Sequence, residues 1–118
     1  MKRLLCIVSN NPLDGSKVIE QLEAAMVAAV FEFHVSILFI GDGVNCLRQN
    51  QNGDLLGARS PGKLIDGLDI YEINNLYVCV ESVESVESQK ILEHIQPINL
   101  IEQRLLIQEQ DIVLGGAA

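Results

Sequence analysis

The chain has 118 residues, of which 48% are hydrophobic, 20% are charged and only 4% are aromatic. This length suits one domain with an aliphatic core, and the hydrophobic fraction excludes a globally disordered chain. Sixteen acidic residues against eight Lys and Arg give a net charge of -8, which argues against independent binding of DNA or RNA, because such binding usually needs a basic face.

Strands are predicted where short aliphatic runs are bounded by Gly, Pro, Asn or Ser. These runs cover residues 4–8, 35–40, 76–80, 95–98 and 112–114. Apolar residues recur at helical spacing in 16–33 and 98–107, and a short helix is expected over 44–48. An exposed loop is expected over 49–62, and the acidic repeat 81–88 is expected to join a strand to a helix.

The alternation of strands and helices predicts an α/β fold of the flavodoxin-like kind. We expect a three-layer sandwich with a mainly parallel sheet of about five strands, because continuous aliphatic runs are typical of parallel strands buried on both faces. The expected organisation is one domain over residues 1–118. The first apolar run is too short for a signal peptide, and no stretch approaches the length of a membrane span, so a cytoplasmic location is expected.

Two stretches are weak candidates for phosphate binding. Gly57 to Lys63 has the glycine and lysine spacing of a P-loop, but Leu64 stands where a hydroxyl residue is needed to hold magnesium. The turn over residues 9–16, after the first strand, is only a weak version of the phosphate turn of a flavodoxin. We therefore expect neither a nucleotide nor a flavin as cofactor.

Metal and hydrolase chemistry also lack a pattern. His34 and His94 are the only histidines, and neither has a carboxylate or cysteine at metal-ligand spacing. The sequence has no serine nucleophile elbow. Asp42-Gly43 follows the second predicted strand at the edge where open parallel sheets usually bind ligands, but we favour a role for Asp42 as the cap of the next helix. No bound metal is expected.

The three cysteines, Cys6, Cys46 and Cys79, are odd in number and widely spaced, which argues against disulfides. Cys6 lies inside an apolar run and is expected to be buried and inert. Cys46 has no neighbour that would activate it. Cys79 falls near the carboxyl end of a predicted central strand, which is the usual ligand edge of such sheets.

Cys79 is therefore the one candidate catalytic residue. A helix start expected at Ser82 or Ser85 would favour a thiolate there, which could attack a persulfide and carry its outer sulfur. Glu81 and Glu84 would oppose the thiolate. A purely structural thiol remains the alternative.

Several segments resemble one known family. Residues 38–44, LFIGDGV, followed by Leu47 and Gln51, are similar to the FI-x-DGV-x-x-L-x-x-x-Q stretch of TusC and DsrF proteins. Residues 70–78 resemble the Y-[DE]-[IV] segment that leads into their third strand, and residues 111–114 also fit. The similarity extends over nearly the whole chain at matching spacings, so the chain resembles the TusC/DsrF family of sulfur-relay subunits.

The resemblance implies a DsrE/DsrF-like fold and a hetero-oligomer, a heterohexamer with TusD/DsrE-like and TusB/DsrH-like subunits. Such complexes pass persulfide sulfur between carrier proteins, toward tRNA 2-thiouridine in the Tus branch and in sulfur oxidation in the Dsr branch. Their acceptor cysteine belongs to the TusD/DsrE-like subunit, so the resemblance implies a non-catalytic subunit of a sulfurtransferase complex. The branch stays open, because Asn45-Cys46 replaces the aromatic-Gln pair usual after Asp-Gly-Val.

Two alternatives remain at this point. The chain could be a stand-alone DsrE-like sulfur carrier that uses Cys79 itself. It could also be a non-catalytic flavodoxin-like interaction domain without sulfur chemistry. The position and surroundings of Cys79 in the folded chain bear on this choice.

Overall fold

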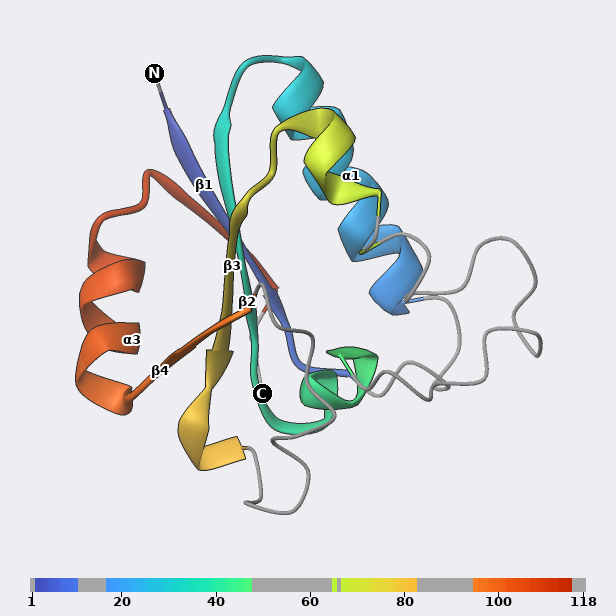
Figure 1. Cartoon of the computed structure of the whole chain (residues 1–118). Helices are drawn as coiled ribbons and strands as arrows, with labels where there is room; N and C mark the ends of the chain where they lie inside the picture. Colours follow the sequence, from blue (N-terminus) through green and yellow to red (C-terminus); the bar gives the residue numbers. More distant parts are fainter. Residues whose placement is uncertain (1, 11–16, 48–64, 66, 83–94, 116–118) are drawn as a thin grey trace.

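The protein forms an α/β sandwich around a five-stranded, wholly parallel sheet (Figure 1). The computed structural model describes residues 2–10, 17–47, 65, 67–82 and 95–115. The sheet has the order β4-β3-β2-β1-β5. Its strands are β1 (Arg3–Val8), β2 (His34–Phe39), β3 (Asn75–Cys79), β4 (Gln96–Ile98) and β5 (Ile112–Gly115). All five predicted strands are confirmed to within one residue at each end.

Helices lie on both faces of the sheet, which confirms the three-layer prediction. The helix α1 (Lys17–Val30) covers one face together with the short 3₁₀ helix η4 (Leu68–Tyr71), and α3 (Leu100–Gln108) lies against the other (Figure 1). Two further 3₁₀ helices, η1 (Gly41–Leu47) and η5 (Val80–Ser82), follow β2 and β3. In the described part of the chain, no helix is long and apolar enough to cross a membrane.

The core is aliphatic and divided by the sheet. The larger cluster lies between the sheet and α1, where Leu22 and Ala25 are fully buried against Phe39. The smaller one lies on the α3 face around Leu5 and Leu38. Because the central strands are buried on both faces, they need the continuous apolar runs from which they were predicted.

The helix α3 begins with a capping box. Asn99 Oδ1 accepts a hydrogen bond from the Glu102 N–H at 2.8 Å, and the Glu102 carboxylate accepts one from the Asn99 N–H at 3.0 Å. This reciprocal pair satisfies two N–H groups at the helix start. Pro97, just before this cap, lies in β4, an edge strand, where a missing N–H is tolerated.

The segment after β2 differs from its prediction in one respect. The short helix was expected over 44–48 with Asp42 as its cap, but η1 already begins at Gly41, so Asp42 lies in its first turn. Gly41 has a φ of 51°, in the left-handed region that favours glycine. The chain can turn directly into η1 at this residue, which leaves no position for a separate cap at Asp42.

Gly43 serves a different purpose, the close approach of η1 to β1. A Cβ atom at Gly43 would overlap the carbonyl oxygen of Val8 and lie 2.6 Å from its carbonyl carbon. Two backbone hydrogen bonds fix this approach: the Ile40 N–H donates to Val8 O at 3.0 Å, and the Gly43 N–H donates to Ile40 O at 2.9 Å. Only glycine fits here without moving the backbone.

Candidate functional site

Cys79 is the last residue of β3 and lies at the carboxyl edge of the sheet, as predicted. In the β3–β4 register it stands opposite Ile98, the last residue of β4. The chain then turns through η5, which contacts η1 from the neighbouring strand. The carboxyl ends of β2, β3 and β4 thus surround the cysteine, at the edge where ligands of open parallel sheets usually bind.

The thiol of Cys79 is shielded from solvent. The residue is only 4% exposed, and its Sγ donates a hydrogen bond to Oε2 of Glu81 at 3.7 Å. Glu81 itself is exposed. A sulfur nucleophile must be reached by its partner's sulfur, so this arrangement requires a local opening of η5 before Cys79 can react.

The helix start expected after Cys79 is not found at Ser82. Ser82 is instead the last residue of η5, a 3₁₀ helix of three residues. The alternative start at Ser85, and Glu84 with it, lie outside the described residues, as does the rest of the acidic repeat. The described structure therefore offers Cys79 a carboxylate partner and only the start of the three-residue η5, with no α-helix N-terminus beside it.

Cys6 is buried, as predicted. It lies mid-strand in β1 with no exposed surface, and its Sγ donates to the backbone carbonyl of Gln21 in α1 at 3.7 Å. Burial disfavours the charged thiolate and raises the pKa of Cys6 from 9.0 to about 12. This thiol is thus protonated at physiological pH and belongs to the core between β1 and α1.

Burial of Cys6 predicts a loss of stability at alkaline pH. The folded-state pKa lies above the unfolded value, so the contribution of the protonated thiol is complete below pH 9 and is lost between pH 9 and about 12. Over that window the free energy of unfolding should fall by roughly 1 kcal/mol per pH unit from this group. Urea unfolding at several pH values, with Cys6→Ala as the comparison, measures it; an equally steep fall in Cys6→Ala would assign the effect to other groups.

The remaining candidates contribute little to a site. Cys46 lies in η1, but its side chain is outside the described residues. His34 is exposed at the opposite, amino edge of the sheet, where its Nε2 lies 2.9 Å from the Nδ2 of Asn75. His94 and the P-loop-like stretch 57–64 are outside the described residues. Among the residues that are described, no group of His, Cys, Asp or Glu could hold a metal ion.

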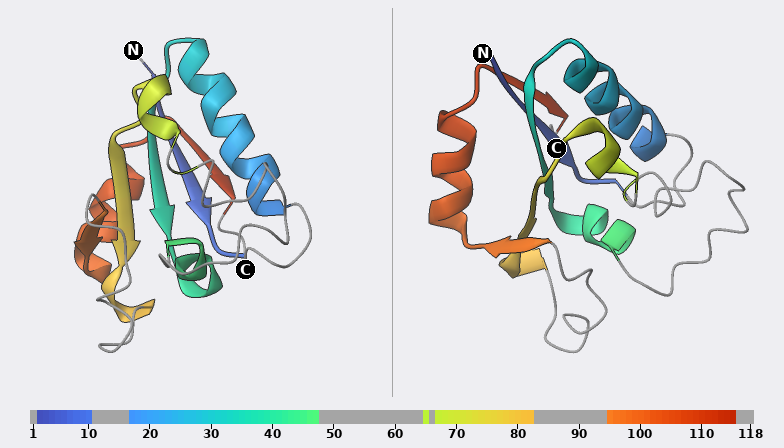
Figure 2. Two further views of the ribbon diagram at one scale, coloured as in Figure 1. Left: turned by 45° about the vertical axis from the view of Figure 1, so that its right-hand side comes forward. Right: turned by 45° about the horizontal axis from the view of Figure 1, so that its top comes forward.

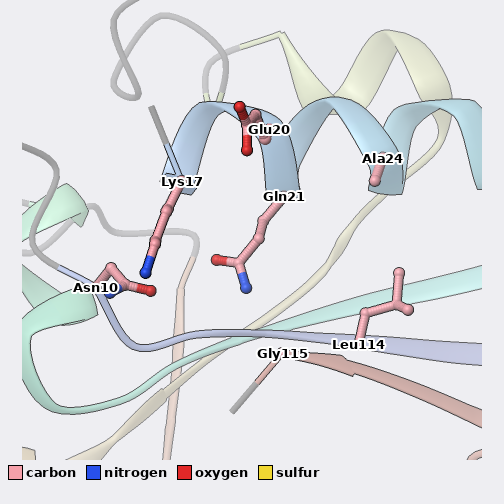
Figure 3. Close-up of a pocket in the computed structure, with 7 residues that line it drawn as sticks. All are labelled: Asn10, Lys17, Glu20, Gln21, Ala24, Leu114 and Gly115. Carbon is pink, nitrogen blue, oxygen red and sulfur yellow. The ribbon is translucent and has the colours of Figure 1, made fainter. Parts of the chain in front are cut away.

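A cavity of about 320 Å³ lies at the same carboxyl edge as Cys79, but beside β1 and β5 and not beside β3. It opens between the first turns of α1 and the ends of β1 and β5 (Figure 3). Lys17 and Gln21 extend from α1 toward the strands, and Asn10 approaches from the end of β1 (Figure 3). The turn over residues 9–16, the weak candidate for binding a flavin phosphate, begins at this cavity, but residues 11–16 are outside the described residues.

Gln21 is the residue of this cavity that sequence patterns did not single out. Its Nε2 donates to the carbonyl of Ile7 at 3.4 Å, and its Oε1 is buried without a hydrogen-bond partner among the described residues. Gly115 makes room for it, because a Cβ atom there would overlap Nε2. No sequence motif predicts that a single Gln on the flank of a helix will contact a strand, so the contact of Gln21 with Ile7 is found only in the folded structure. Cys79 does not line the cavity, so the two features form no common site.

Comparison with known proteins assigns the chain to a family. The model of the DsrE/DsrF-like family matches residues 2–115. The chain belongs to the DsrE/DsrF-like family. One similar protein is described as a TusC homolog from Aliivibrio fischeri. It is 32% identical to this chain over 79 residues, which are 67% of each chain.

The fold has a solved counterpart. The crystal structure of the ychN protein from E. coli superimposes with a TM-score of 0.80 over 97% of this DsrE/DsrF-like chain and 98% of that one. The sequence identity is only 14%, so this likeness supports the fold alone. The fold was expected from the alternation of strands and helices, and the family from the resemblance of several segments to TusC and DsrF proteins; both are confirmed.

Proposed function

We propose that the chain is a TusC/DsrF-like subunit of a cytoplasmic sulfur-relay complex, in which it braces a partner's reactive cysteine. The observation that carries the proposal is the family match over residues 2–115, together with a relative described as a TusC homolog. In this role the chain assembles with a TusD/DsrE-like and a TusB/DsrH-like subunit. The complex passes persulfide sulfur between carriers, toward tRNA 2-thiouridine or in sulfur oxidation.

The surroundings of Cys79 favour a bracing role over a carrier role. A carrier thiol must meet two partners in turn, once to take sulfur and once to release it. Cys79 is 4% exposed and hydrogen-bonded to Glu81, which suits a thiol that fills space beneath η5. The stand-alone carrier that uses Cys79 is therefore the second candidate, and it would need η5 to move aside at each transfer.

Assembly is the direct test of this proposal. When the chain is co-expressed with affinity-tagged TusD/DsrE-like and untagged TusB/DsrH-like subunits of its source, we expect all three to purify together in constant ratio. The exposed apolar side chains of the isolated chain are the physical reason, since subunits of obligate complexes leave such surface uncovered when alone. Sedimentation of the purified material gives the stoichiometry. A chain that remains separate from both subunits would contradict the proposal and leave the interaction-domain alternative.

A further inference from the structure

An exposed apolar surface lies where the end of α1 meets η4. We call it the acidic apolar surface; its apolar members are Val27, Val30, Phe31, Ile70 and Tyr71. Phe31 is 71% exposed and Ile70 is 81% exposed, which is unusual for side chains of this size in a small domain. The helices α1 and η4 contact each other. Figures 1 and 2 show η4 beside the carboxyl-terminal half of α1.

Helix geometry places Val30, near the end of α1, on the side of η4. Gln21 and Ala24 line the cavity next to β5, so their flank of α1 faces one end of the sheet. At 100° per residue, Val30 falls about 180° from Gln21, on the flank toward β3 and the η4 segment that precedes it, whereas Val27 faces solvent, about 60° from Ala24. The end of α1 at Val30 therefore lies on the same side as the apolar side chains of η4, with Val27 at the solvent-facing margin.

The described charged side chains at the rim of this surface are mostly acidic. Glu32, Asp69 and Glu72 are exposed at its rim. Neither stretch 23–33 nor stretch 67–75 contains a Lys or Arg. The carboxyl terminus of α1 adds the negative end of its dipole, and no basic residue stands in its last turn to compensate it. Three carboxylates and the helix dipole therefore outweigh Lys2, which lies near the end of α1 because its carbonyl accepts the His34 N–H.

Both rim glutamates occupy backbone positions that normally favour glycine. Glu32 ends α1 with a φ of 68°, and Glu72 ends η4 with a φ of 62°. At the end of α1, the Glu32 N–H donates to Ala29 O at 3.0 Å and the Phe33 N–H donates to Ala28 O at 3.1 Å, the pattern of a Schellman motif in which glycine is usual. A left-handed backbone conformation at a glutamate lowers the stability of the isolated chain. Strained backbone conformations occur preferentially at functional sites.

We propose that the acidic apolar surface is the docking site for a different chain, whose contact face is apolar at its centre and basic at its rim. A second copy of this chain fits poorly, because it would bring glutamates against glutamates. The exposed face of α3 differs, because a basic residue, Arg104, stands between its apolar residues Ile101 and Leu105. The proposal rests on the proposed function for the partner's identity, one of the two other subunits of the complex.

The location of the docking site has a consequence for the chemistry. The acidic apolar surface lies at the amino edge of the sheet, because α1 runs antiparallel to the strands and η4 precedes β3 (Figure 2). Cys79 lies at the carboxyl edge. A partner docked on this surface therefore leaves the end of β3 and η5 uncovered, available to the subunit that carries the acceptor cysteine.

The test measures binding of the full chain to the co-purified TusD/DsrE-like and TusB/DsrH-like subunits at several salt concentrations. Phe31→Ser/Ile70→Ser should weaken binding roughly tenfold or more, as expected for central apolar contacts. Glu32→Gln/Glu72→Gln should weaken it less but flatten its dependence on salt, because the rim charges act through a screened field. Ile101→Ser/Leu105→Ser removes as much apolar surface from α3 and should keep the native salt dependence.

A glycine variant separates docking from folding. Glu32→Gly/Glu72→Gly should raise the melting temperature of the isolated chain and yet weaken binding, which a purely structural role of these residues cannot produce. Native binding and native salt dependence in both the serine and the glutamine variants would overturn the docking site and leave the proposed function intact. A homodimer of the native chain that Phe31→Ser/Ile70→Ser dissolves would also overturn it. Failure of the native chain to bind either subunit would overturn the docking site and the proposed function together.

Discussion

Replacing Gly43 with Ala should lower the free energy of unfolding by about 3 kcal/mol or more, because no space exists for the added methyl group. Its Cβ atom would overlap Val8 O, and that oxygen cannot retreat without breaking its hydrogen bond from the Ile40 N–H. Val8 is fully buried in the core, so β1 cannot shift either. The expected loss is a large part of the stability of a domain of this size.

Gly41→Ala is the matched control. Gly41 lies two residues earlier in the same helix, but a Cβ atom there has nothing within 4 Å, so only its φ of 51° opposes a side chain. We expect this variant to lose about 1 kcal/mol. Urea unfolding of both variants separates steric overlap from backbone conformation. Equal losses in the two variants would show that the approach of η1 to β1 is looser than described.

The strands and long helices were predictable because their signals are local. Each strand is a run of aliphatic residues between turn residues, and burial on both faces leaves no other pattern for it. The helical spacing predicted one apolar face of α1 formed by Leu22, Ala25, Met26, Ala29 and Val30; the first four belong to the core cluster, but Val30 is 64% exposed. The carboxyl end of α1 was expected at Phe33 but falls at Val30, because Glu32 turns left-handed and ends the helix.

The 3₁₀ segments and their contacts were not predictable in this way. The start of η1 at Gly41 depends on the approach of Gly43 to Val8, a residue more than thirty positions away in the chain. The hydrogen bond between Cys79 and Glu81 depends on η5, which is too short to show a helical period. The sequence could place Cys79 at the correct edge, but its shielding follows only from these tertiary contacts.

The two cysteines of the described sheet should differ sharply in reactivity. Cys6 has a pKa of about 12, so roughly one molecule in ten thousand carries its thiolate at pH 8, and it lies within the core. Cys79 needs only the three-residue η5 to open. In a Cys46→Ser background, alkylation of the native protein should label Cys79 roughly tenfold faster or more. Labelling of Cys6 first would contradict the position of β1 in the core.

Reactivity of this kind does not require a role in sulfur transfer, and Cys79→Ser decides the point. Serine is slightly smaller than cysteine but can still donate to Glu81, so the sheet edge and the assembly of the complex should persist. Under the bracing role, the partner's cysteine carries the sulfur, and the reconstituted complex should transfer radiolabelled persulfide sulfur at a rate within a few-fold of the native one. Cys6→Ser serves as a control for loss of activity through misfolding, because it places a hydroxyl in the core. A Cys79→Ser complex that assembles normally but transfers no sulfur, with the partner's cysteine intact, would identify Cys79 as a sulfur carrier and contradict the bracing role.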